Sequence, residues 1–155
     1  MSKIRVGDPL DKNTDIGAIN SKAQLEKIKE LAASGSAEGG EIWSPTCELP
    51  KNGFWFAPTI FTGVTQAHRI AREEIFGPVV SVIKWSDEAT MFEQVNSVEY
   101  GLTASIWTND VTTAHRAAMT VEAGFVWVND VSKHFLGTPF GGFKQSGIGR
   151  EECIE

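Results

Sequence analysis

The sequence has few cysteines, few histidines and no long apolar run, and each shortage argues against a class of protein. Its 155 residues contain no stretch of 18 apolar residues, so no membrane-spanning helix is predicted. The amino terminus carries Lys3 and Arg5 but no apolar stretch after them, which argues against a signal peptide. A net charge of −6 argues against nucleic acid as a partner, because phosphates attract basic surfaces. We therefore expect a soluble, acidic protein.

Two cysteines and three histidines leave little room for disulfide or metal chemistry. Cys47 and Cys153 lie far apart in sequence; they could pair, but a chain of this length needs no disulfide, and two thiols fit a reducing cytoplasm equally well. The histidines, His68, His115 and His134, show no ligand spacing with each other or with either cysteine. We expect no metal site and a cytoplasmic location.

The first half of the chain predicts one helix and two short strands within a single domain that spans residues 1–155. Ser21 and Gln24 have the spacing of a capping box, in which the serine accepts from the backbone at Gln24 and the glutamine side chain reaches back. An apolar stripe follows, and Gly35 is a natural end for the helix. Strands are expected at residues 41–43 and 54–61, the second irregular because Pro58 cannot donate to a ladder.

The second half alternates strands with helices. The helices begin at Ser86 or Asp87 and at Asp110, and the predicted strands cover residues 79–85, 103–108 and 125–129. This alternation predicts an α/β fold with a parallel sheet and helical crossovers. Three strands are few for such a sheet, so we expect an unpaired edge if a neighbouring strand comes from elsewhere. Three tryptophans at or near the strand ends are predicted to be in the core: Trp85, Trp107 and Trp127.

Two segments could carry chemistry on local grounds. The glycine-rich stretch from Gly137 to Gly149 does not complete either phosphate-loop pattern and is read as a turn-rich loop, in which Phe140 could line a pocket. Glu73 and Glu74 are either a solvated charge cluster or carboxylates that accept hydrogen bonds from ribose hydroxyls. Each cysteine has a neighbouring glutamate, which does not favour a thiolate, so neither is expected to be an activated nucleophile.

Six ordered segments together resemble the carboxy-terminal part of the catalytic domain of NAD(P)-dependent aldehyde dehydrogenases. The match runs through essentially the whole chain. The segments are Gly7-Asp8-Pro9, Gly53-Phe54-Trp55-Phe56-Ala57-Pro58-Thr59, Glu73-Glu74-Ile75-Phe76-Gly77-Pro78-Val79, Tyr100-Gly101-Leu102, Val126-Trp127-Val128-Asn129, and Pro139 through Glu151.

The resemblance implies roles for four residues and a Rossmann-like, parallel sheet. In that family the residue matching Glu74 holds the ribose next to the nicotinamide, and the one matching Phe76 packs beside it. Phe140 matches an aromatic residue of the funnel that admits the aldehyde, and Asn129 begins the loop that lines this funnel. The cofactor implied is NAD or NADP, and the residues do not show which.

The family oxidises an aldehyde to a carboxylic acid with a cysteine nucleophile and a glutamate general base. Neither has a counterpart in these residues, so the chain alone is expected to be catalytically inactive. Its expected partners are a small aldehyde and either a missing amino-terminal portion or a second copy. The alternative is a non-enzymatic interaction module that pairs with a full-length relative, and a weaker one is a thiol enzyme using Cys47 or Cys153.

The loop after Asn129 carries Lys133 and His134, where many members of the family place apolar or aromatic groups. If both side chains face the funnel, the resemblance implies a preference for a polar or anionic aldehyde. The opposite reading is that both point to solvent, because lysine is rarely buried without a partner.

Overall fold

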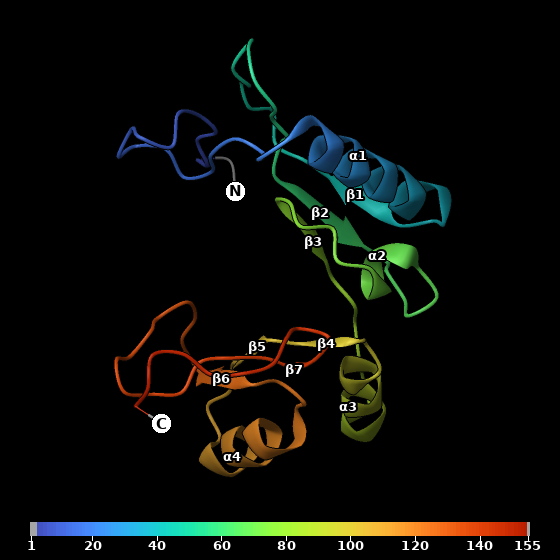
Figure 1. Cartoon of the computed structure of the whole chain (residues 1–155). Helices are drawn as coiled ribbons and strands as arrows, with labels where there is room; N and C mark the ends of the chain where they lie inside the picture. Colours follow the sequence, from blue (N-terminus) through green and yellow to red (C-terminus); the bar gives the residue numbers. More distant parts are fainter. Residues whose placement is uncertain (1–2, 155) are drawn as a thin grey trace. The chain divides into compact units, whose positions relative to one another are not determined.

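The computed structural model describes residues 3–154 and divides the chain into two compact units (Figure 1). The first unit ends at Lys84 and the second begins at Trp85. The single domain expected over residues 1–155 stays a prediction, because compactness within a chain does not decide whether two units fold together.

The first unit contains α1 (Lys22–Ala37), whose start follows the predicted cap. The hydroxyl of Ser21 accepts from the backbone N–H of Gln24 at 3.1 Å, as expected. The apolar stripe is buried, but Gly35 does not end the helix. A Cβ at Gly35 would lie 2.7 Å from Cδ1 of Ile70, so this glycine lets two segments pack closely and the helix continues past it.

The sheet of the first unit has the order β1-β2-β3, and α1 lies across it (Figure 1). The strands β1 (Glu41–Trp43) and β2 (Thr59–Thr62) are antiparallel, whereas β2 and β3 (Val79–Ser81) are parallel and are connected through the short helix α2 (Arg69–Arg72). Apolar residues of α1, β2, α2 and the following loops share one core: Ile28, Leu31, Ala32, Phe61, Val64, Ile70 and Ile75.

The second unit has α3 and α4 and two small sheets. Asp87 caps α3 (Glu88–Asn96) and Asp110 caps α4 (Val111–Thr120), both as predicted. The parallel pair is β5 (Thr103–Ile106) with β6 (Phe125–Val128), connected through α4, and the antiparallel pair is β4 (Tyr100–Gly101) with β7 (Phe143–Lys144). The α/β prediction with parallel strands and helical crossovers is thus confirmed.

The structure corrects which strands are partners. The three strands expected in one parallel sheet are divided, since β3 pairs with β2 and β5 pairs with β6 among the described residues. Strand 54–61 is regular only from Thr59 onward. Trp127 is buried as predicted, but Trp85 and Trp107 are 55% and 65% exposed. A position near a strand end does not decide whether another element covers the side chain.

Cys47 and Cys153 are both free and partly buried. No helix among residues 3–154 is long and apolar enough to cross a membrane.

Candidate functional site

The candidate cofactor residues Glu74 and Phe76 lie on the loop between α2 and β3. Ile75 between them is buried in the core, and the flanking side chains are exposed. Phe76 is 69% exposed and has a positive φ of 53°. An exposed aromatic in a left-handed conformation is strained, and such strain is concentrated at functional sites.

The loop is held by a side chain from the first turn of α1. The amide of Gln24 donates to the carbonyl oxygen of Ile75 at 2.8 Å and to that of Phe76 at 3.4 Å. The capping-box prediction for this side chain is therefore wrong, since it crosses to a partner 51 residues away. At Gly77 a Cβ would lie 2.6 Å from Cδ1 of Ile28, so the next residue of the loop is also fixed against α1.

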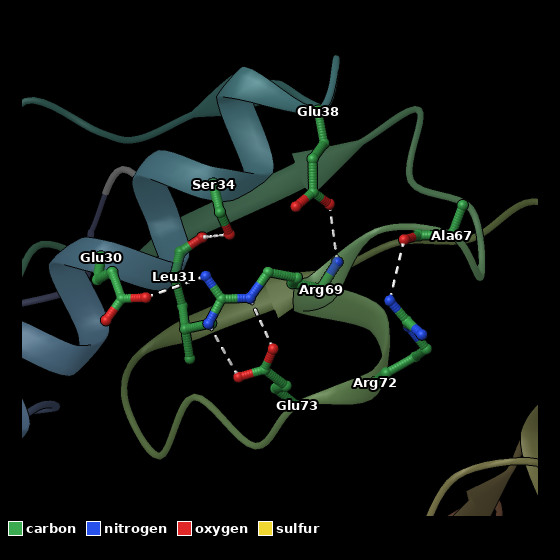
Figure 2. A network of polar contacts seen from close by, with 8 residues as sticks. All are labelled: Glu30, Leu31, Ser34, Glu38, Ala67, Arg69, Arg72 and Glu73. Atoms are coloured by element: carbon green, nitrogen blue, oxygen red, sulfur yellow. Dashed lines mark hydrogen bonds and ion pairs between the residues drawn. The ribbon is translucent and has the colours of Figure 1, made fainter.

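Arg69 fixes the start of the same loop through three glutamates (Figure 2). Its guanidinium donates to both carboxylate oxygens of Glu73, at 2.7 and 3.1 Å, and to Glu30 of α1 at 3.0 Å. Its backbone N–H donates to Glu38 at 2.8 Å. The hydrogen bonds from Arg69 lower the pKa of Glu73 and raise that of Arg69. Glu73 is thus committed to a structural pair.

Glu74 has a different environment from Glu73. Among residues 3–154, no hydrogen bond or ion pair engages the carboxylate of Glu74, which is exposed. An ionised carboxylate is an acceptor with two oxygens, and the paired hydroxyls of a ribose are donors. Of the two neighbouring glutamates, the structure leaves Glu74 as the one that can accept from a ligand.

In the second unit, Asn129 joins the two loops that leave the carboxyl ends of β5 and β6. Its Oδ1 accepts from the N–H of Thr108 at 2.9 Å, and its Nδ2 donates to the carbonyl of the same residue at 2.9 Å. Asn129 has a φ of 53°, a conformation that asparagine tolerates better than most residues. Because both ends of the amide are engaged, Asn129 positions the loop.

Phe140 contacts an aromatic cluster and also lines a cavity. Its ring centroid lies 5.5 Å from that of Phe125 and 4.5 Å from that of His134, while Phe125 and Trp127 are 4.8 Å apart. The cavity has a volume of about 300 Å³ and is otherwise lined by Leu102 and the glycine-rich segments 141–142 and 146–151. The structure therefore places Phe140 at a cavity, as the sequence suggested.

Lys133 and His134 differ in their surroundings. The ammonium of Lys133 pairs with Asp130 at 2.8 Å, and its side chain is 65% exposed. His134 packs on Phe140, and its Nδ1 lies 2.8 Å from Oε1 of Glu152. Both side chains are exposed to solvent, but His134 also packs against the ring of Phe140, whereas Lys133 pairs only with Asp130. Whether either side chain faces the funnel stays a prediction.

Three contributors escaped sequence reasoning: Gln24, Arg69 and Glu152. Gln24 and Glu152 act through partners far away in the chain, and so does Arg69 in its contacts with Glu30 and Glu38, and local patterns carry no signal for such pairs. Only the pair of Arg69 with Glu73 has a local spacing, of four residues. Among residues 3–154, no group of three histidine, cysteine, aspartate or glutamate side chains is arranged to hold a metal ion.

A sequence model described as the aldehyde dehydrogenase family matches residues 1–155. The chain belongs to the aldehyde dehydrogenase family. It is 50% identical to aldehyde dehydrogenase tropH of Talaromyces stipitatus, over 97% of this chain and 31% of the relative. It is 44% identical to a betaine aldehyde dehydrogenase of Mesorhizobium japonicum, over 98% of this chain and 32% of the relative.

Solved structures of the family share the fold. The NAD+ complex of aldehyde dehydrogenase from Bacillus cereus aligns with a TM-score of 0.86 and 39% identity, covering 95% of this chain and 30% of that one. An indole-3-acetaldehyde dehydrogenase of P. syringae, in complex with NAD+ and IAA, aligns with a TM-score of 0.89 and 38% identity, covering 97% and 31%. This member of the family thus spans about a third of the length of the relatives it matches.

Proposed function

We propose that these residues are part of an NAD(P)-dependent aldehyde dehydrogenase that oxidises an aldehyde to a carboxylic acid. The observation that carries the proposal is the loop 74–76, which presents an unpaired carboxylate and a strained, exposed phenylalanine from a packed core. Support comes from the family match over residues 1–155 and from relatives solved with NAD+.

Glu74 fits a nicotinamide cofactor because its carboxylate is a hydrogen-bond acceptor and the ribose hydroxyls are donors. Its free carboxylate accepts hydrogen bonds from ribose hydroxyls, and Phe76 beside it offers an apolar face to the ring that the ribose carries. Bound NAD(P)+ supplies a hydride acceptor. Gln24 and Arg69 keep the loop in place while the cofactor binds.

In the second unit, Phe140 is proposed to line the aldehyde-binding funnel and Asn129 to hold the loop that forms it. We place the cysteine nucleophile and the glutamate base outside these residues. The 155-residue chain alone is then inactive and binds dinucleotide weakly.

The test has two parts. The purified chain is mixed with a panel of aldehydes and NAD+ or NADP+, and we expect no NADH or NADPH. A complete enzyme is then built by joining residues 1–155 to the amino-terminal portion of a relative, and we expect turnover.

In that complete enzyme, Glu74→Gln should raise the KM for the dinucleotide about tenfold or more, because replacing the charged carboxylate weakens its hydrogen bonds to the two ribose hydroxyls. The exposed Glu93→Gln is the control. An unchanged KM for Glu74→Gln contradicts the assigned role.

Association with an amino-terminal portion or with a second copy is also proposed, and so is a cytoplasmic location, to which the two free cysteines are suited. Many large apolar side chains of the second unit are exposed, among them Trp107 and Leu136 at 65% and 96%. Exposed apolar surface of this extent marks interaction sites.

The exposed apolar surface of the second unit also favours a second candidate function, an interaction module without catalysis. Size-exclusion chromatography decides, since a lone monomer at high concentration contradicts self-association.

A further inference from the structure

His134 belongs to the aromatic cluster that contains Phe140. Its ring centroid lies 4.5 Å from that of Phe140 and 6.3 Å from those of Phe125 and Trp127. The side chain is 44% exposed. The imidazole therefore adds one polar, partly accessible ring to an otherwise apolar cluster.

The orientation of this imidazole is fixed from the end of the chain. Nδ1 of His134 lies 2.8 Å from Oε1 of Glu152, and an ionised carboxylate can only accept, so Nδ1 carries the proton. In the neutral ring the other nitrogen, Nε2, is then a hydrogen-bond acceptor. No hydrogen bond to Nε2 is present among residues 3–154. A directed acceptor is thus left free beside Phe140.

Glu152 has a strained backbone conformation and a carboxylate whose hydrogen bonding is incomplete. Its φ is 64°, although it is not a glycine, and its second carboxylate oxygen is buried without a partner. The N–H of Gly137 donates to its backbone carbonyl at 2.7 Å, and Phe140 and Glu151 exchange two backbone hydrogen bonds of 3.0 and 2.8 Å. A strained residue with a poorly satisfied carboxylate has a functional explanation if its purpose is to orient His134.

The charges nearby disfavour an anionic ligand. Lys133 is paired with Asp130. The guanidinium of Arg150 lines the cavity and keeps its positive charge, because the carbonyls of Gly142 and Gly149 to which it donates are neutral, but Glu151 lines the same cavity with a negative charge. Glu152 itself contributes a negative charge next to the imidazole. A neutral ligand with a hydrogen-bond donor fits this environment better than a carboxylate does.

We propose that His134, oriented by Glu152, is a specificity-determining residue that selects flat, aromatic aldehydes bearing a hydroxyl group, which donates to Nε2. The inference rests on the proposed function, because it takes Phe140 as part of the aldehyde funnel. A site that accepts a hydrogen bond from a substrate hydroxyl discriminates against the analogue without it, since its acceptor is then left unpaired.

The first experiment measures kcat/KM of the complete enzyme carrying residues 1–155 for 4-(hydroxymethyl)benzaldehyde, 4-methylbenzaldehyde and 4-carboxybenzaldehyde. It is done at an alkaline pH, where histidine is ordinarily neutral and an alcohol keeps its proton. We expect the hydroxylated aldehyde to be preferred. His134→Phe, which keeps an aromatic ring, should lower the ratio of hydroxylated to plain substrate about tenfold. His134→Gln, which retains an acceptor, should restore part of the preference, and Lys133→Met is the control that should leave it unchanged.

The outcomes separate the two proposals. No turnover with any aldehyde contradicts the proposed function and the inference with it. Turnover with the same ratio in His134→Phe contradicts the inference alone, and so does a preference for 4-carboxybenzaldehyde that Lys133→Met abolishes.

A second measurement needs no activity. Imidazole 15N NMR of the 155-residue chain should show His134 protonated at Nδ1, and Glu152→Gln should alter that signal more than it alters those of the other histidines. A neutral His134 that is protonated at Nε2 contradicts the proposal.

Discussion

The two units of the chain present their candidate site residues in different ways. In the first, Glu74 and Phe76 flank Ile75, which is anchored in a continuous core that includes the fully buried Phe61. In the second, Asn129 and Phe140 belong to loops tied by polar and aromatic contacts, and no residue of α3 is buried. Burial of Ile75 and hydrogen bonds from Gln24 and Arg69 together position the first pair. The second pair has no such core residue between its members, and the hydrogen bonds of Asn129 depend on how far the surroundings exclude water.

The largest expected effect concerns the core of the first unit. Phe61→Ala removes a fully buried aromatic of the first unit and should lower the free energy of unfolding by about 3–5 kcal/mol. Met119→Ala on α4 of the second unit is the control, since that side chain is 88% exposed and should change it by less than about 0.5 kcal/mol. Urea denaturation of both variants provides the comparison, and similar losses would show that the first unit has no dominant core.

The next effect concerns the loop of the first unit. Gln24→Leu removes the donor to the carbonyls of Ile75 and Phe76 and should cost about 1–2 kcal/mol of unfolding free energy. The control Lys22→Ala changes an exposed residue on the same helix. In the complete enzyme, only Gln24→Leu should also raise the KM for the dinucleotide. A stability loss with no change in KM would separate the loop from cofactor binding.

A matching test in the second unit separates backbone strain from hydrogen bonding at Asn129. Asn129→Ala loses both bonds to Thr108 and places a less tolerant residue at positive φ, so we expect a loss of about 1–2 kcal/mol. Asn129→Gly loses the same bonds but accepts the backbone conformation, and about half of that loss is expected. Equal losses in urea denaturation would mean that the conformation contributes nothing.

The smallest effect is the pH dependence of two exposed carboxylates, one in each unit. The pKa of Glu73 is lowered by Arg69, and that of Asp87 by the backbone N–H and hydroxyl of Thr90. A folded-state pKa below the unfolded value stabilises the fold above the unfolded value, and this contribution is lost as the pH falls through the folded pKa. Glu73→Gln and Asp87→Asn should therefore each flatten the loss of stability in acid, below about pH 4.5 for Glu73 and about pH 4 for Asp87.

Salt sharpens this last comparison. The pair between Arg69 and Glu73 is exposed, so 0.5 M sodium chloride should remove most of its contribution to stability, because the added salt shortens the Debye length. The helix cap at Asp87 relies on short hydrogen bonds and should change less. Acid denaturation of Glu73→Gln and Asp87→Asn, followed by circular dichroism with and without the added salt, checks this. An equal change with salt in the two variants would contradict it.

Local features of the structure were predictable. The caps at Ser21, Asp87 and Asp110 were found from sequence because a cap bonds within three residues of itself. The parallel pair of β5 and β6 followed from the alternation of strands and helices, whereas the pairing of β3 with β2 did not. Of the three tryptophans expected in the core, only Trp127 is buried. The exposure of Trp85 and Trp107 was not predictable, because it depends on which elements cover them.

The sequence by itself determined the α/β class and the helix starts, which follow from spacing and from residue types that act over one or two turns of chain. It also carried the resemblance to the family, and the roles of Glu74, Phe76, Asn129 and Phe140 that this resemblance implies stay predictions. Tertiary structure alone decided that Gln24 binds the loop at Ile75 and that Glu152 orients His134. Both contacts join residues distant in sequence, and only the packing of the intervening segments brings such atoms within hydrogen-bonding distance.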